Sequence, residues 1–233
     1  MPESIHSGHR ERVRKEIIKN GFDENTPPHK IIEFLLFYCI SRKDTNPLAH
    51  RLINRFGSIP ELLDAPLEEI AAVEGMSESS ALLIKSILPI ARIYFVEKAN
   101  EKATFNSLDD IGRYALNQYI GVTNEQASIM AFDGKGKLLG FEFLLKGDIS
   151  SVGLSFRDTV TRLMKLNAVS AVLIHNHPSG IAVPSPTDAV ITQKLSESLA
   201  NSGIYLIDHI ILGFGDFVSM AQSKEYSYLF KNN

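Results

Sequence analysis

The first hundred residues carry apolar side chains at the three- and four-residue spacing of helices that are buried along one face. Ser77, Glu78 and Ser80 supply the residue types that begin a helix, and they precede the longest of these segments. The N-terminal half is therefore predicted to be helical. The expected helices cover residues 10–19, 30–41, 47–55, 67–73 and 77–99.

The pattern breaks at 100–107, where the residues are polar and have no period, and we interpret this stretch as a linker. Ser107-Leu-Asp-Asp then resembles a capping box and predicts a helix that continues to about Ile120. The break divides the chain into two predicted domains, 1–102 and 103–233.

In the second half, short apolar runs alternate with helical periodicity. The turn sequence Asp133-Gly-Lys-Gly joins the first two runs into a predicted hairpin. The prediction is a mixed α/β domain in which a sheet is flanked by helices. Strands are expected over 126–132, 137–145, 168–174, 204–212 and 217–219, and helices over 156–166 and 187–200.

Composition restricts the class of protein. The 233 residues are 44% hydrophobic, which is enough for one large domain or two small ones. The net charge of -3 gives no basic footprint of nucleic-acid binding, and Cys39 is the single cysteine, which fits a reducing compartment. No apolar run reaches the roughly 18 residues of a membrane span. We expect a cytoplasmic protein without a membrane partner.

The candidate chemistry lies in the stretch His175-Asn-His-Pro-Ser-Gly180 and the helix start that follows it. Side chains two apart on a strand project to one face, so His175 and His177 could share a metal ion. A loop then returns the chain to Asp188. Three such ligands leave zinc an open fourth position, as in catalytic sites.

Each of these residues also has a purely structural explanation. A histidine on an apolar strand is commonly a core or rim residue. Ser185 at an N-cap, with Pro186 after it and Asp188 three residues on, makes a well-formed helix start without any metal. The two explanations are compatible, since a helix N-terminus is a rigid mount for a carboxylate ligand.

The spacing His-x-His-x7-Ser-x-x-Asp over 175–188 resembles the JAMM motif of the JAB/MPN metalloproteases. Other segments along nearly the whole chain resemble the bacterial RadC proteins. They include Ser7-Gly-His-Arg10, Glu33-Phe-Leu-Leu-Phe-Tyr38, Arg55-Phe-Gly-Ser58, Lys146-Gly-Asp-Ile-Ser150, Phe156-Arg-Asp158 and Leu206-Ile-Asp-His-Ile210.

This resemblance implies a fold and a set of roles. A helical domain with a helix-hairpin-helix element would precede a cytidine-deaminase-like JAB/MPN domain. His175, His177 and Asp188 would bind Zn²⁺, and Ser185 would help to hold the water or the oxyanion. A glutamate on an upstream strand would be the general base, and Glu125 matches its place better than Glu142 does.

The chain also departs from the RadC pattern. Gly147-Asp148 stands in place of Gly-Thr, and Phe156-Arg-Asp in place of Pro-Arg-Glu. Gly75-Met76-Ser77 stands in place of a Gly-hydrophobic-Gly hairpin, whose second glycine lets the backbone approach DNA phosphate. The Cβ of Ser77 weakens the expectation of DNA binding.

Three hypotheses follow. The leading one is a zinc-dependent hydrolase of an amide or isopeptide bond in an unknown peptide or protein substrate. The second is a DNA-associated repair or replication accessory protein, whose N-terminal domain would bind DNA only weakly, since residues 1–102 hold 14 Lys+Arg against 15 Asp+Glu. The third is a metal-free MPN scaffold, against which the intact ligand set argues. The sequence leaves the oligomeric state open.

Overall fold

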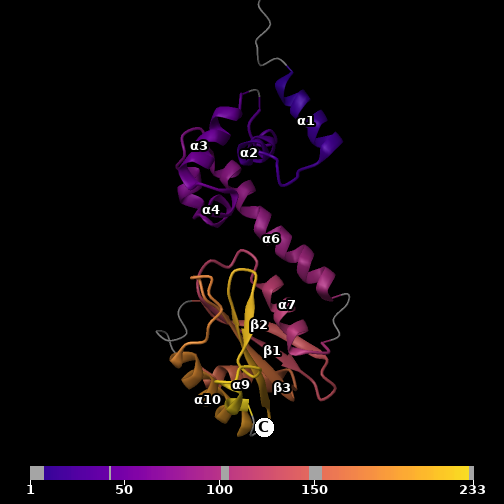
Figure 1. The fold of residues 1–233 in the computed structure, drawn as a ribbon, viewed down its shortest axis with the longest axis vertical. Helices are drawn as coiled ribbons and strands as arrows, with labels where there is room; N and C mark the ends of the chain where they lie inside the picture. Colours follow the sequence, from indigo (N-terminus) through magenta and orange to yellow (C-terminus); the bar gives the residue numbers. More distant parts are fainter. Residues whose placement is uncertain (1–7, 42, 101–104, 147–153, 231–233) are drawn as a thin grey trace, which may run out of the picture. The chain divides into compact units, whose positions relative to one another are not determined.

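The computed structural model describes residues 8–41, 43–100, 105–146 and 154–230, and it divides into two compact units, Met1–Ala91 and Arg92–Asn233 (Figure 1). The division falls within α6 (Glu78–Asn100). Residues 101–104 of the expected linker lie outside the described part of the chain, and so do Gly147 and Asp148 of the RadC comparison. Each unit has its own core and is described by itself.

Unit 1 is helical, as the apolar spacing predicts. Its core is formed by fully buried side chains from several helices, among them Ile32, Leu52, Leu62 and Ile84. The helix α4 was not predicted, because its six residues are too few to show a helical period. The elements are α1 (His9–Asn20), α2 (Pro28–Leu36), α3 (Asn46–Phe56), α4 (Ile59–Asp64), α5 (Leu67–Ala71) and the first half of α6.

The turn between α5 and α6 is tightly organised. Gly75 has a φ of 94°, in the left-handed region that glycine adopts without steric cost. The backbone N–H of Ser77 donates to Oγ of Ser80 (2.9 Å), and the N–H of Ser80 donates to Oγ of Ser77 (3.2 Å). Ser77 therefore caps α6, as predicted, and its own N–H is already used.

Among the described residues, α6 is the one helix that is long and apolar enough to cross a membrane, judged by length and composition alone. A single such helix is weak evidence of a membrane span. In this chain it also contributes Ala81 and Ile84 to the core of unit 1.

Unit 2 is built on a five-stranded mixed sheet with strand order β2-β1-β3-β4-β5. The β3–β4 pair is parallel, and the other neighbouring pairs are antiparallel. The predicted hairpin is β1–β2. The strands are β1 (Gln126–Phe132), β2 (Leu138–Lys146), β3 (Ser170–Asn176), β4 (Tyr205–Leu212) and β5 (Phe217–Ser219).

Helices cover both faces of this sheet, as the alternation of strands and helices predicts (Figure 1). On one face, α7 (Leu108–Gln118) packs against even-numbered residues of β3 such as Val172 and Ile174. On the other face, α9 (Phe156–Lys165) and α10 (Pro186–Ala200) pack against Ala171 and Leu173. A short 3₁₀ turn, η1 (Ser227–Phe230), follows the last strand.

Candidate metal centre

β3 carries the first histidine. The strand continues through Asn176, two residues further than predicted, so His175 is part of the hydrogen-bonded sheet and is fully buried. The N–H of His177 donates to the carbonyl of Leu212 on β4 (2.9 Å), which continues the pairing past the end of the strand. Because side chains alternate, both histidines project to the face that α10 covers.

The loop after His177 returns the chain to this face. Gly180 has a φ of 81°, and its N–H donates to the carbonyl of His177 (2.9 Å). Its own carbonyl accepts from the N–H of Phe214 (3.0 Å), which anchors the loop to the segment after β4. The loop ends at Ser185, the N-cap of α10.

The first turn of α10 holds the carboxylate. Oγ of Ser185 accepts from the N–H of Asp188 (3.2 Å), and Oδ2 of Asp188 accepts from the N–H of Ser185 (2.6 Å), so the two residues form a capping box. The hydroxyl of Ser185 also donates to the same Oδ2 (2.7 Å). Oδ1 of Asp188 takes no part in the capping box and faces His175.

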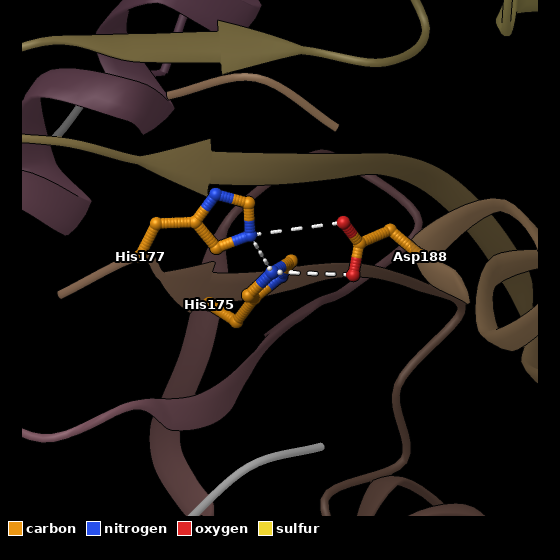
Figure 2. Close-up of side chains that lie close together, drawn as sticks. All are labelled: His175, His177 and Asp188. Carbon is orange, nitrogen blue, oxygen red and sulfur yellow. Dashed lines mark hydrogen bonds and ion pairs between the residues drawn. The ribbon is translucent and has the colours of Figure 1, made fainter. Parts of the chain in front are cut away.

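Figure 2 shows that the three predicted ligand residues converge. Nε2 of His175 lies 2.9 Å from Nε2 of His177 and 3.3 Å from Oδ1 of Asp188, and Nε2 of His177 lies 3.7 Å from Oδ2 of Asp188. Zinc bonds of about 2.0–2.1 Å in a tetrahedral site set neighbouring ligand atoms roughly 3.3 Å apart. The donor set therefore fits a zinc ion in both chemistry and spacing.

Burial gives the cluster an inner side and an outer side. The side chain of His175 is 0% exposed and that of Asp188 is 6% exposed, whereas that of His177 is 20% exposed. Nδ1 of His177 lies 3.0 Å from the carbonyl of Ile181 and must donate to it, because a carbonyl can only accept. Nε2 of neutral His177 therefore keeps its lone pair for a metal.

His209 adjoins the cluster through His175, and its sequence context alone predicts no role for it. It is fully buried on β4, with Nε2 2.8 Å from Nδ1 of His175 and Nδ1 2.6 Å from Oγ1 of Thr192. Burial first, and then the neighbouring His175 and His177, lower the pKa of His209 well below its usual value, so the ring is neutral. The only available signal was a histidine within an apolar strand, because its contact depends on the parallel pairing of β3 with β4.

The two candidate bases lie in different surroundings. Ala127 pairs with His175 across β1 and β3, so Glu125 and His177, two residues beyond each, lie opposite one another past the same end of the two strands. Glu142 pairs with Ile129 further along the sheet, and its carboxylate accepts from Nη1 of Arg162 on α9 (3.1 Å). Of the two, Glu125 is at the end of the sheet where the histidines lie.

Asn176, between the two histidines, faces the other side of the sheet and binds the chain around Glu125. Its Oδ1 accepts from the N–H of Gln126 (2.8 Å), and its Nδ2 donates to the carbonyl of Asn124 (3.1 Å). The side chain is 8% exposed. One buried amide thus fixes the peptide groups on both sides of Glu125.

A domain with this sheet, a His-x-His pair at the end of its third strand and an aspartate in the following helix is a JAB/MPN-type domain. Residues 105–226 match the RadC-like JAB domain family. The chain is also 30% identical over 229 residues to a UPF0758 protein of Fusobacterium nucleatum subsp. nucleatum, and the match covers 95% of this chain and 98% of that relative. The chain belongs to the RadC family.

Proposed function

We propose that this protein is a zinc-dependent hydrolase of an amide or isopeptide bond in a peptide or protein. The observation that carries the proposal is the convergence of His175, His177 and Asp188: the two Nε2 atoms lie 2.9 Å apart, and each lies near one carboxylate oxygen of Asp188, at 3.3 Å for His175 and 3.7 Å for His177. Three protein ligands and the partial exposure of His177 leave room for a further ligand on the outer side. Bound zinc would lower the pKa of a coordinated water to roughly 7 and polarise a carbonyl.

Glu125 is proposed as the general base. Its place opposite His177 supports this role, which is to take a proton from the attacking water and pass it to the leaving amine. Asn176 supports the role by holding both flanking peptide groups, so that the start of β1 is fixed before substrate arrives. A catalytic carboxylate needs such fixed backbone because small errors in position cost rate.

Ser185 is proposed to orient Asp188 and, as the family resemblance implies, to assist the oxyanion. Its hydroxyl proton is directed at Oδ2 of Asp188 over 2.7 Å. Donation to an oxyanion requires that this proton turn away from Asp188. The two roles therefore predict different effects when the hydroxyl is removed.

The proposal is tested by metal analysis of the purified full chain, followed by hydrolysis of a peptide library with and without a chelator. We expect about one zinc per chain, loss of that zinc in His177→Ala, and chelator-sensitive cleavage. Equal zinc in wild type and His177→Ala would contradict the site. Absence of zinc from the wild type, even after incubation with it, would favour a metal-free scaffold.

The alternative of DNA association is proposed only as weak binding by unit 1. The N–H of Ser77, at the place where a helix-hairpin-helix would meet phosphate, already donates to Ser80. We expect weak binding of duplex DNA that is lost at higher salt, because such contacts release counterions. Titration of the full chain at two salt concentrations tests this, and tight binding at high salt would contradict it.

The single cysteine supports a cytoplasmic location.

A further inference from the structure

We propose that His209 and Thr192 hold His175 in the tautomer that presents its Nε2 lone pair to the metal. This inference rests on the proposed metal site and assigns positioning residues within it. Three hydrogen bonds carry it, and they form one buried chain. Nδ1 of His175 meets Nε2 of His209 (2.8 Å), Nδ1 of His209 meets Oγ1 of Thr192 (2.6 Å), and that hydroxyl donates to the carbonyl of Asp188 (2.6 Å).

The donor and acceptor of each of these hydrogen bonds follow from the carbonyl of Asp188, which ends the series. A carbonyl oxygen only accepts, so the hydroxyl proton of Thr192 points to Asp188. Oγ1 of Thr192 must then accept the proton on Nδ1 of His209. A neutral imidazole has one donor and one acceptor, so Nε2 of His209 accepts from Nδ1 of His175. Nδ1 of His175 therefore carries a proton, so Nε2 is the atom of this ring that can give its lone pair to a metal.

The chain of hydrogen bonds connects two of the proposed ligand residues, His175 and Asp188. Thr192 lies one turn after Asp188 on α10, so the same hydroxyl that directs His209 also binds the backbone of a ligand residue. Thr192, His175 and His209 are each 0% exposed, so water does not compete for these bonds. Hydrogen bonds from a ligand histidine to a buried partner fix its tautomer and ring orientation.

If the hydrogen bonds to both nitrogens of His209 ran in the opposite direction, His175 could not present its Nε2 lone pair to a metal. Thr192 would then donate to Nδ1 of His209, and Nε2 of His209 would donate to Nδ1 of His175. The remaining proton of His175 would lie on Nε2, directed at Oδ1 of Asp188 across the 3.3 Å gap. The carbonyl of Asp188 would also lose the hydroxyl of Thr192 as a donor and keep only its helical N–H donor, and a hydrogen bond lost in a buried site costs free energy. The two polarities thus correspond to opposite tautomers of His175.

Nuclear magnetic resonance on the metal-free full chain separates these states. Long-range ¹H–¹⁵N spectra of the histidine rings report which nitrogen carries the proton. We expect Nδ1 to carry a proton in both His175 and His209, and we expect His209→Phe to leave His175 protonated on Nε2 alone. A wild-type His175 protonated on Nε2 alone, or a His175 protonation pattern unaffected by His209→Phe, would overturn the inference.

Metal affinity supplies the second readout, measured by chelator competition. His209→Phe should weaken zinc binding by about 10–100-fold, the usual effect of losing such a partner. His209→Gln should restore most of it, because its amide can accept from His175 and donate to Thr192. Thr192→Val should weaken binding in the same direction, and Thr192→Ser should not. Equal affinity in all four variants would overturn the inference.

Thr159→Val is the matched control. Thr159 is buried on α9, and its Oγ1 donates to the carbonyl four residues earlier (3.1 Å), as Thr192 does on α10, but it has no histidine partner among its described contacts. Its zinc affinity should stay within about twofold of wild type. If wild type itself binds no zinc, the proposed function fails, while the tautomers of the metal-free protein still decide this inference.

Discussion

Two helices of unit 2 begin with the same local sequence pattern and yet have different surroundings. Ser155 precedes Asp158 at the start of α9, and Ser185 precedes Asp188 at the start of α10. In both helices the serine Oγ accepts from the aspartate N–H at 3.2 Å. The two caps therefore share this bond, and in α10 Oδ2 of Asp188 also accepts from the N–H and the hydroxyl of Ser185.

The carboxylates differ in what they face. Asp158 is 53% exposed and accepts from Nε of Arg162 (2.8 Å), and Arg162 also binds Glu142, so a cation neutralises both acids. Asp188 is 6% exposed and faces two histidines instead of a cation. The start of α10 lies at the carboxyl end of β3, whereas α9 lies beside β2. Topology, rather than the cap, makes one of these aspartates a candidate ligand.

The largest expected effect separates the two aspartates. Asp188→Asn should weaken zinc binding by more than about 100-fold, beyond the 10–100-fold typical of losing a mere supporting partner. Asp158→Asn should leave zinc affinity unchanged, because the described contact of its carboxylate is with half-buried Arg162 on the same helix and not with a histidine. Chelator competition measures both. Equal losses in the two variants would show that helix capping, and not ligation, carries the effect.

The comparison extends to the two glutamates. Glu125→Gln should lower hydrolysis by about 10²–10⁴-fold and leave zinc content unchanged, since a proton acceptor is removed and no ligand is. Glu142→Gln should retain activity, because Glu142 belongs to the ion-pair group of α9. Steady-state cleavage with parallel metal analysis tests the pair. If only Glu142→Gln lost activity, the general base would be Glu142 on β2 and not Glu125.

Asn176 sharpens the same test. Asn176→Ala removes both hydrogen bonds around Glu125 and should lower the rate in the wild-type background. In the Glu125→Gln background it should cause little further loss, because its effect acts through that carboxylate. Additive losses would instead assign Asn176 a general effect on stability.

The sequence predicted most of this arrangement, and its limits have physical causes. β1 and β5 lie at the predicted residues, since each is a short apolar run with turns beside it. The end of β3 was placed two residues early, because His175 and Asn176 are polar and are buried only by partners distant in sequence. His209 and Asn176 could not be assigned roles, since their contacts depend on strand pairing and on residues 34 to 52 positions away.

Asp208 offers a third comparison, a buried carboxyl with no Arg or His side chain at its oxygens among the described contacts. Its Oδ1 accepts from the N–H groups of His209 (2.7 Å) and Ala221 (2.8 Å). Burial raises the pKa of Asp208 from 3.8 to about 6, although these donors oppose the shift. The folded state therefore keeps this proton where the unfolded state has lost it.

This raised pKa makes the free energy of unfolding depend on pH. The contribution of Asp208 to stability is fully present below pH 3.8 and is lost as pH rises to about 6, a change of about 3 kcal/mol. Asp208→Asn does not titrate, so its free energy of unfolding should rise relative to wild type by that amount between pH 4 and pH 7. Urea unfolding across this range measures it. Asp133→Asn should give the opposite slope, and only as pH falls to about 4 and below, because backbone N–H groups lower the pKa of Asp133 below 3.8. Parallel curves for Asp208→Asn and wild type would contradict the shift.

The smallest expected effect comes from substituting the two N-cap serines, Ser155 and Ser185. Their comparison distinguishes helix capping from support of the ligand Asp188. Ser155→Ala and Ser185→Ala should each cost about 1 kcal/mol of unfolding free energy, since each loses an N-cap. Only Ser185→Ala should also weaken zinc binding, by about 10-fold, because its hydroxyl and its Oγ-capped turn hold Oδ2 of Asp188. If Ser185→Ala kept full zinc affinity and lost only turnover, the hydroxyl would act on the oxyanion, as the family resemblance implies. If it lost affinity in proportion to turnover, orientation of Asp188 would account for its place in the motif. The serine of α9 makes the same Oγ bond to an aspartate N–H and has no described histidine beside it, so it provides the baseline for both outcomes.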